Sequence, residues 1–196
     1  ADVNDPPTYE ALARFLPKDA LLVTSHLQRT HQTANAIREA GLELPDPHIE
    51  EDLAEQDFGD WQGQKHEEVY AKLDAKHTFW LAPANSKAPG GESFADLMTR
   101  TIAVIDRLTE SHVGRDIVAV THGGTIRAAL GHALGLDPEG ALTCQIDNCS
   151  VTRIDRFGPT ESHPEGAWAV FHMNQIPTLD SVLTPDPTAM LAQVQR

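Results

Sequence analysis

The 196-residue chain has little positive charge, few cysteines and no long apolar segment. Its 15 basic residues stand against 29 acidic ones, which gives a formal net charge of −14. Because so negative a surface repels nucleic acid and anionic membranes, we expect neither as a partner. No apolar stretch approaches the roughly 20 residues that a transmembrane helix needs, so we expect no membrane span.

Two cysteines, Cys144 and Cys149, are too few for a disulfide framework and do not form a Cys-x-x-Cys motif. Free thiols in a reducing compartment are the simpler interpretation, and we expect a cytoplasmic protein. The length and the 40% hydrophobic content suit one domain over residues 1–196 with a buried core. Proline and glutamine near the end predict a loosely held tail over 184–196.

Strand-like and helix-like patterns alternate along the chain. Short apolar runs at 20–24 and 117–121 predict strands that are buried on both faces. Helical spacing of apolar residues occurs over 9–16, 27–40, 67–77, 92–112 and 124–134. Two alternating segments, 150–154 and 167–171, predict an antiparallel hairpin. The order predicts an α/β fold, a three-layer α/β/α sandwich with a mostly parallel central sheet and a C-terminal antiparallel hairpin.

The most informative segment is Thr121-His122-Gly123-Gly124, where the second apolar run ends and a helical pattern begins at once. In an open α/β sheet this position borders the ligand crevice, and the first amides of the following helix favour anions. A histidine beside an anion-binding helix start indicates chemistry on a phosphate-like group. The alternative is a histidine that merely caps the strand.

A second junction between a strand and a helix carries Ser25 at the strand end and Arg29 in the first helical turn. A cation there opposes the helix dipole, which favours a bidentate phosphate clamp over a stabilising role. A solvated surface arginine is the alternative. In a chain this acidic, a phosphate site has to be a local positive pocket built from a few arginines and histidines.

A loop over 53–63 contains Glu55 among several carboxylates, with Phe58 and Trp61 close in sequence. These aromatic rings are able to desolvate a neighbouring acid and raise its pKa toward that of a proton donor. The alternative is a solvated carboxylate, as most loop acids are. Farther on, Glu92 and Ser93 are expected to begin a helix.

Taken in order, four motifs resemble those of the histidine phosphatase superfamily, also called phosphoglycerate mutase-like. They are SHLQRTHQTA at 25–34, EQDFGDWQG at 55–63, GGES at 90–93 and THGGTIR at 121–127. The resemblance implies phosphoryl transfer through a phosphohistidine, with no metal or other cofactor. It implies catalytic roles for His122, Glu55 and Arg29, and phosphate binding by Arg29, His122, Gly123 and Ser25.

The family's first strand ends in Arg-His-Gly, which supplies the nucleophilic histidine, and this tripeptide does not occur in the chain. We expect the natural polypeptide to extend upstream of Ala1 and to provide that first strand. Two alternatives stay open. One is a binding or regulatory homologue that holds phosphoesters without catalysis; the other is a different histidine, such as His26, acting as the nucleophile.

The sequence therefore predicts a phosphomonoesterase that hydrolyses a small phosphorylated metabolite. A phosphoglycerate-type mutase is the alternative, but it would need further basic residues for a second anionic group. The segment 64–91 offers lysines and no arginine, which favours hydrolysis. We expect the region between Glu55 and Glu92 to cover the pocket, where His66, Tyr70, Phe79 and Trp80 are candidates for contacts. The oligomeric state stays open, a homodimer included.

Overall fold

The computed structural model describes residues 5–73 and 75–180. Its central sheet has three parallel strands in the order β2-β1-β3. They are β1 (Leu21–Thr24), β2 (His48–Ile49) and β3 (Ile117–Val120). The two longer strands match the apolar runs that predicted them, whereas the two-residue β2 gave no signal in the sequence. The predicted parallel sheet is thus confirmed.

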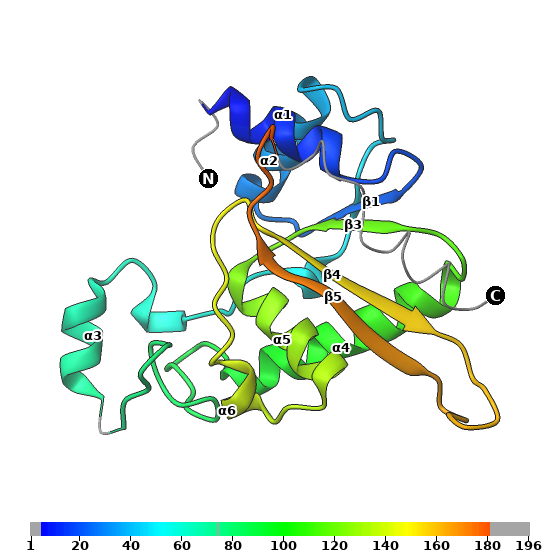
Figure 1. Cartoon of the computed structure of the whole chain (residues 1–196). Helices are drawn as coiled ribbons and strands as arrows, with labels where there is room; N and C mark the ends of the chain where they lie inside the picture. Colours follow the sequence, from blue (N-terminus) through cyan, green and yellow to red (C-terminus); the bar gives the residue numbers. More distant parts are fainter. Residues whose placement is uncertain (1–4, 74, 181–196) are drawn as a thin grey trace.

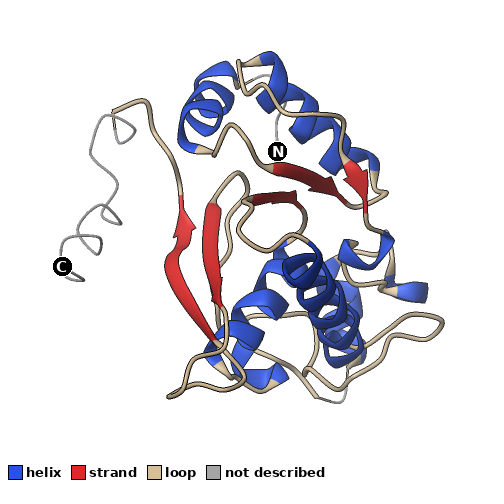
Figure 2. Ribbon diagram, turned by 90° about the vertical axis from the view of Figure 1, so that its right-hand side faces the viewer, coloured by secondary structure: helices blue, strands red, loops and turns tan. Residues whose placement is uncertain are grey.

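Helices cover both faces of this sheet, as Figures 1 and 2 show. On one face, α1 (Pro6–Phe15) and α2 (Gln28–Glu39) pack on Leu22 and Val118. On the other face, α4 (Phe94–Ser111) packs on Val23, and α5 (Gly123–Leu134) lies beside α4. Adjacent residues of β1 point to opposite faces, which is why its short run is apolar throughout. The layers expected of an α/β/α sandwich are present.

The C-terminal hairpin consists of β4 (Val151–Phe157) and β5 (Ala167–Gln175), paired antiparallel as predicted. It forms a sheet of its own, and β4 is the hairpin strand nearer to β3 in both ribbon views (Figures 1 and 2). Within the described residues no ladder joins β3 to β4. No residue of either hairpin strand is fully buried. Both β3 and β4 therefore keep an edge with which no described strand pairs.

The segment between the sheet and α4 departs most from expectation. Helix α3 covers His66–Lys72 and ends where Leu73 takes an extended backbone, so the prediction of a helix to residue 77 is wrong. It lies in a lobe that projects from the body of the molecule (Figure 1). Ahead of α3 the chain forms two short 3-10 turns, η1 (Glu51–Leu53) and η2 (Gly59–Trp61), one at the start of the expected loop and one within it.

Two further helices begin at residues whose side chains cap them. Helix α4 begins at a capping box in which the Ser93 hydroxyl accepts from the Asp96 amide, as expected for a helix start there. A short unpredicted helix, α6 (Pro138–Ala141), is capped by Asp137. The tail predicted over 184–196 lies outside the described residues. None of the helices in the described part has the length and apolar content to cross a membrane.

Candidate functional site

The site is built around His122, which ends β3 and is the N-cap residue of α5. Its ring is buried, with Nε2 lying 2.8 Å from the Ser25 hydroxyl and Nδ1 accepting a 3.1 Å hydrogen bond from Nε of Arg29. Ser25 directly follows β1, and Arg29 is in the first turn of α2. Because β1 and β3 are parallel neighbours, their carboxyl ends meet at one edge of the sheet. The structure thus brings together three residues that the sequence singled out.

These contacts fix the protonation of the His122 ring. Since Nδ1 accepts from the guanidinium of Arg29, the proton of the neutral ring is on Nε2 and is donated to Ser25. Burial lowers the pKa of His122 to about 4, helped by the positive charges of Arg29, Arg100 and His26. At neutral pH the ring is uncharged: its Nε2 proton is donated to the fully buried Ser25 hydroxyl, and its Nδ1 faces Arg29.

Glu55 lies against the first turn of the same helix. Its Oε2 accepts from the Gly124 amide at 3.3 Å, and its Oε1 accepts from the Gln56 amide at 3.0 Å. A carboxylate is favoured at a helix N-terminus by the exposed amides and the helix dipole. A Cβ on Gly124 would collide with Oε1 of Glu55, so this approach requires glycine. The Glu55 carboxylate and the His122 ring consequently both lie at the first turn of α5.

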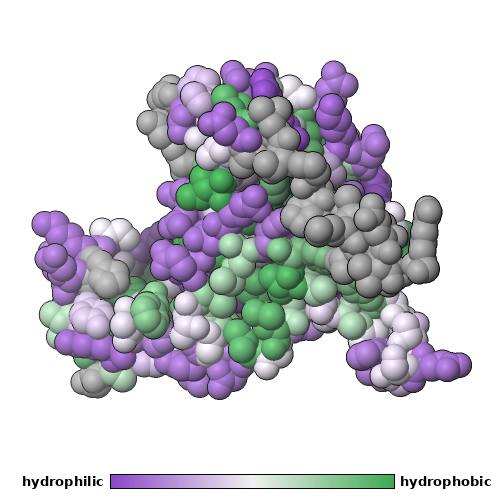
Figure 3. Space-filling model, viewed as in Figure 1, coloured by the Kyte–Doolittle hydropathy of each residue, from purple (hydrophilic) through white to green (hydrophobic). Residues whose placement is uncertain are grey.

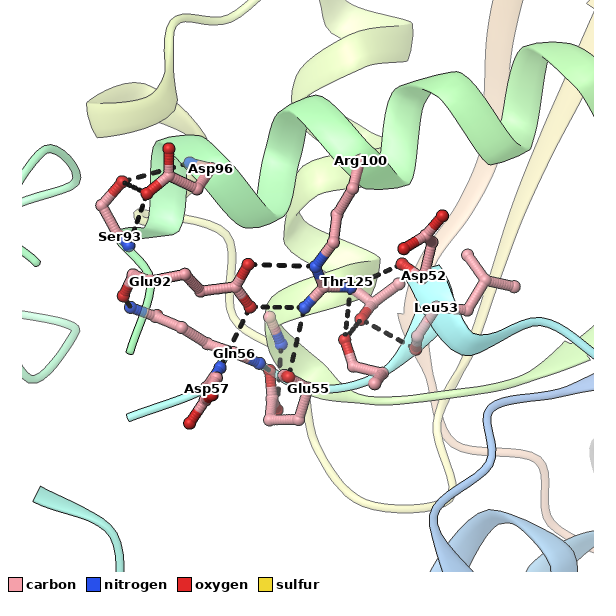
Figure 4. A network of polar contacts seen from close by, with 12 residues as sticks. Asp52, Leu53, Glu55, Gln56, Asp57, Glu92, Ser93, Asp96, Arg100 and Thr125 are labelled. Carbon is pink, nitrogen blue, oxygen red and sulfur yellow. Dashed lines mark hydrogen bonds and ion pairs between the residues drawn. The ribbon is translucent and has the colours of Figure 1, made fainter. Parts of the chain in front are cut away.

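Arg100 holds the loop that carries Glu55, as Figure 4 shows. From the middle of α4 its guanidinium donates to the backbone carbonyls of Asp52, Ala54 and Glu55. It also pairs with both carboxylate oxygens of Glu92, at 3.1 and 2.6 Å. One arginine therefore ties three carbonyls and a carboxylate into a single unit.

The loop is held from a second direction by α5 and by Glu92. The Thr125 hydroxyl contacts the carbonyls of Leu53 and Ala54 at 3.2 and 3.1 Å. Glu92 accepts from the Asp57 amide at 3.0 Å. The sequence predicted only a helix start at Glu92 and gave Arg100 no role, because nothing in local spacing shows that a side chain in mid-helix reaches a distant loop.

Arg127 is a buried cation in the second turn of α5, with 8% of its surface exposed. Its guanidinium carbon lies 4.7 Å from the centre of the Trp80 ring, and a Cβ on Gly123 would lie 3.2 Å from its Nη1. Burial lowers the pKa of Arg127, an effect that the charge of Glu55 opposes. Its Nε has no hydrogen-bond partner within residues 5–73 and 75–180. The sequence placed Arg127 in a motif but did not predict this position.

The remaining candidates lie at the margin. His26 is exposed one residue beyond Ser25, and its charge acts on His122. Gly123, the residue after His122, supplies the first backbone amide of α5. Across the part of the chain that the structure describes, no three side chains of His, Cys, Asp or Glu gather as a metal site would require. The arrangement offers neutral and cationic donors around one helix start, with one carboxylate beside them.

Several known proteins resemble this chain over most of its length. Bifunctional protein Rv2228c of Mycobacterium tuberculosis is 31% identical over 157 residues, which are 80% of this chain but 41% of that protein. The chain thus spans less than half the length of that relative. The 2,3-bisphosphoglycerate-dependent phosphoglycerate mutase 2 of Gloeobacter violaceus is 29% identical, with 87% of this chain and 75% of the mutase covered.

Two phosphatases are similar as well. Glucosyl-3-phosphoglycerate phosphatase of Mycolicibacterium vanbaalenii is 33% identical over 65% of this chain and 58% of its own length. The solved native structure of the mycobacterial glucosyl-3-phosphoglycerate phosphatase Rv2419c superposes with a TM-score of 0.71 at 26% identity, over 87% of this chain and 83% of that one. The model of the histidine phosphatase superfamily, branch 1, matches residues 8–164. This chain belongs to the histidine phosphatase superfamily.

Proposed function

We propose that this protein is a phosphomonoesterase that hydrolyses a small phosphorylated metabolite through a phosphohistidine intermediate. The observation that carries the proposal is the 3.1 Å contact between Arg29 and His122 at the start of α5. The two residues come from separate strand ends and meet beside the carboxylate of Glu55. The phosphatases among the relatives support the reaction class.

The phosphate would be held by Arg29, the Gly123 amide and the His122 ring, whose Nδ1 faces Arg29. The Ser25 hydroxyl is fully buried, so it would hold that ring at Nε2 rather than touch the phosphate. The buried guanidinium of Arg127 adds positive charge next to Gly123. A buried cation that forms no salt bridge in the described part of the chain is costly, and a bound anion would offset that cost. These groups form the local positive pocket that a chain of net charge −14 needs in order to attract a phosphoester.

In the first chemical step, a histidine nitrogen attacks phosphorus in line, the N–P bond forms and the P–O bond to the leaving group breaks. Glu55 donates its proton to the leaving oxygen, so that the product is a neutral alcohol. In the second step, Glu55 removes a proton from water, the water oxygen attacks phosphorus, and the N–P bond breaks with its electron pair returning to the imidazole. Arg29 and His122 stabilise the charge on the non-bridging oxygens in both steps.

We propose that the nucleophilic histidine comes from a further strand that pairs between β3 and β4. No described strand pairs with the facing edges of these two strands, and β4 lies on the β3 side of the hairpin (Figures 1 and 2). Unpaired backbone groups at the inner edges of two sheets are costly, and one added strand would satisfy both. A strand parallel to β3 would end at the same edge of the sheet as His122.

Hydrolysis fits the structure better than transfer between two hydroxyls. A mutase would need cations for a second anionic group, and three of the described lysines of the covering segment have other contacts. Lys72 donates to Gln64, Lys76 lies over the Tyr70 ring, and Lys87 pairs with Asp96.

We also place the protein in the cytoplasm, with a small phosphorylated substrate as its ligand. Both cysteines of the chain, Cys144 and Cys149, are free thiols. Free thiols suit a reducing compartment, which supports this location.

The proposal is tested by denaturing the full-length protein from its native host in alkaline detergent immediately after mixing with a radiolabelled aryl phosphate. We expect a label on histidine that is labile to acid and stable to alkali, and its loss or strong reduction in His122→Ala. His31→Ala, which changes another histidine of the chain in α2, is the matched control. Binding of the phosphoester without a covalent label would contradict the proposal and identify a binding homologue.

A further inference from the structure

A cavity of about 670 Å3 is lined by residues between Phe58 and Leu81. This segment includes α3, which lies in the projecting lobe seen in Figure 1. Five aromatic residues line it: Phe58, Trp61, Tyr70, Phe79 and Trp80. The Phe79 side chain is among the most exposed large hydrophobic residues described, at 57%. An aromatic ring left this open at the wall of a cavity is available to stack on a ligand.

His77 is the one residue of the described lining that can carry a charge near neutral pH, and its Nε2 lies 3.4 Å from Oε1 of Glu139, outside the lining. The described lining residues include no Asp, Glu, Lys or Arg, although 22% of the chain is charged. Several of its polar groups are engaged: Gln64 donates to the Asp60 carbonyl and accepts from Lys72, and Nδ1 of His77 accepts from the Phe79 amide. A sugar needs many directed hydrogen-bond partners, which this wall is poorly equipped to offer. A flat apolar ring needs only the aromatic faces.

The cavity wall is connected to the proposed proton donor through Trp80. The indole Nε1 donates a 2.8 Å hydrogen bond to Oε1 of Gln56, whose backbone amide donates to the Glu55 carboxylate at 3.0 Å. The Phe58 ring, only three residues beyond Glu55, lies 6.2 Å from the Trp80 ring. Arg127, at the start of α5, packs on the Trp80 ring. Trp80 thus lines the cavity and also contacts two neighbours of the site, Gln56 and Arg127.

We infer that this cavity binds the leaving group and that the leaving alcohol carries an uncharged aromatic or heteroaromatic ring. The inference rests on the proposed function, since it names the substrate class of the same site. An aromatic leaving alcohol makes the substrate larger and more apolar than a phosphorylated three-carbon acid. The phosphate is bound by the charged residues at the start of α5, and the ring is bound by Phe79, Trp61 and Trp80.

The test is calorimetric titration of the protein with 1-naphthyl phosphate and glucose 1-phosphate, each as its non-hydrolysable phosphonate analogue, and with inorganic phosphate and 1-naphthol. We expect 1-naphthyl phosphate to bind about tenfold or more tightly than inorganic phosphate, and Phe79→Ala to remove about tenfold of that affinity while leaving phosphate binding unchanged. Phe157→Ala, which removes another exposed ring from the hairpin, is the matched control with no expected effect. In a Trp168→Phe background both remaining tryptophans line the cavity, so quenching of their emission reports its occupancy directly.

The outcomes separate this inference from the proposed function. If phosphate binds but 1-naphthyl phosphate binds no more tightly, the aromatic leaving-group pocket is wrong and the phosphatase proposal is unaffected. Tighter binding of glucose 1-phosphate than of 1-naphthyl phosphate would also overturn the inference, in favour of a sugar. If 1-naphthol binds and quenches the tryptophans in a manner that depends on Phe79 while no phosphate compound binds, the cavity assignment stands and the proposed function is overturned.

Discussion

At the scale of single residues, the site depends on one neutral histidine among cations. His122 is held uncharged by burial and by Arg29, Arg100 and His26, while its Nε2 proton is donated to Ser25. A bound phosphate dianion would raise the pKa of His122, because a negative charge near the ring favours its protonated form. Under the proposed function, phosphate binding would therefore be coupled to proton uptake at His122.

The first prediction concerns the titration of this ring. In nuclear magnetic resonance spectra, His122 should stay neutral until the pH approaches about 4, and Arg29→Met should move its pKa upward toward the ordinary 6.5. The folded-state pKa is the lower one, so protonation favours the unfolded chain. Stability from the neutral ring is complete above pH 6.5 and is lost as the pH falls from there toward 4. A His122 ring that titrates near 6.5 in the wild type would contradict this assignment.

The second prediction tests Glu55 as the acid. Glu55→Gln should reduce kcat for an alkyl phosphate by about a hundredfold or more, because a poor leaving group needs the proton. For an aryl phosphate, whose leaving group is already stable as an anion, the reduction should be much smaller. Steady-state kinetics on both substrates in the full-length protein measure the difference. Equal losses would show that Glu55 does not act as an acid.

A third prediction follows from the contact between Glu55 and Gly124. Gly124→Ala would place a methyl group where Oε1 of Glu55 lies, so the carboxylate has to move. Activity toward alkyl phosphates should fall with little change in the affinity for inorganic phosphate. Gly158→Ala is the control, since a Cβ there meets no atom within 4 Å. Wild-type kinetics in Gly124→Ala would show that the position of Glu55 is not important.

At the scale of secondary-structure elements, α4 and α5 support a loop that has almost no regular structure of its own. Arg100 and Thr125 bind its carbonyls, and Glu92 completes the ion pair with Arg100. Backbone carbonyls in an irregular segment need such donors, because no neighbouring strand supplies them. Glu55 is thus positioned by two helices rather than by the loop itself.

The fourth prediction is that Arg100→Met destabilises the fold by about 2 kcal/mol, since it removes the donor to three carbonyls and to the largely buried Glu92. Urea unfolding at neutral pH measures the change. Arg38→Met, which removes a more exposed pair with Asp46, should change stability by less than about 0.5 kcal/mol. A similar small effect for both variants would mean that the Arg100 network does not hold the loop.

The sequence predicted the helices and strands that have a regular apolar pattern, and it predicted which strand ends meet. It did not predict side-chain positions that depend on contacts between residues far apart in the chain. β1, β3, α4 and α5 follow directly from apolar patterns, and the meeting of Ser25, Arg29 and His122 follows from parallel strands that end at one edge. The role of Arg100 and the burial of Arg127 did not, because both depend on which residues fold over them. Helix α3 ends earlier than predicted because the apolar pattern over 67–77 gives no sign that Leu73 takes an extended backbone.

At the scale of the whole molecule, a small site with positively charged side chains lies in a protein of strongly negative net charge. Hydrophilic residues dominate the outer surface of the N-terminal helices, at the top of Figure 3, whereas apolar residues gather lower on that face. The net charge of −14 repels a phosphoester at long range, so Arg29, Arg127 and the start of α5 have to act at short range. The strand proposed to pair between β3 and β4 would end at the same edge of the sheet.

The most direct test of the central claim is a titration of the protein with inorganic phosphate, followed by nuclear magnetic resonance of the His122 ring and the Gly123 amide. The account predicts that both signals shift together with one Kd, that the pKa of His122 rises on saturation, and that Arg29→Met weakens the binding at least about tenfold. Phosphate binding that leaves both signals unchanged, or no binding at all, would contradict it.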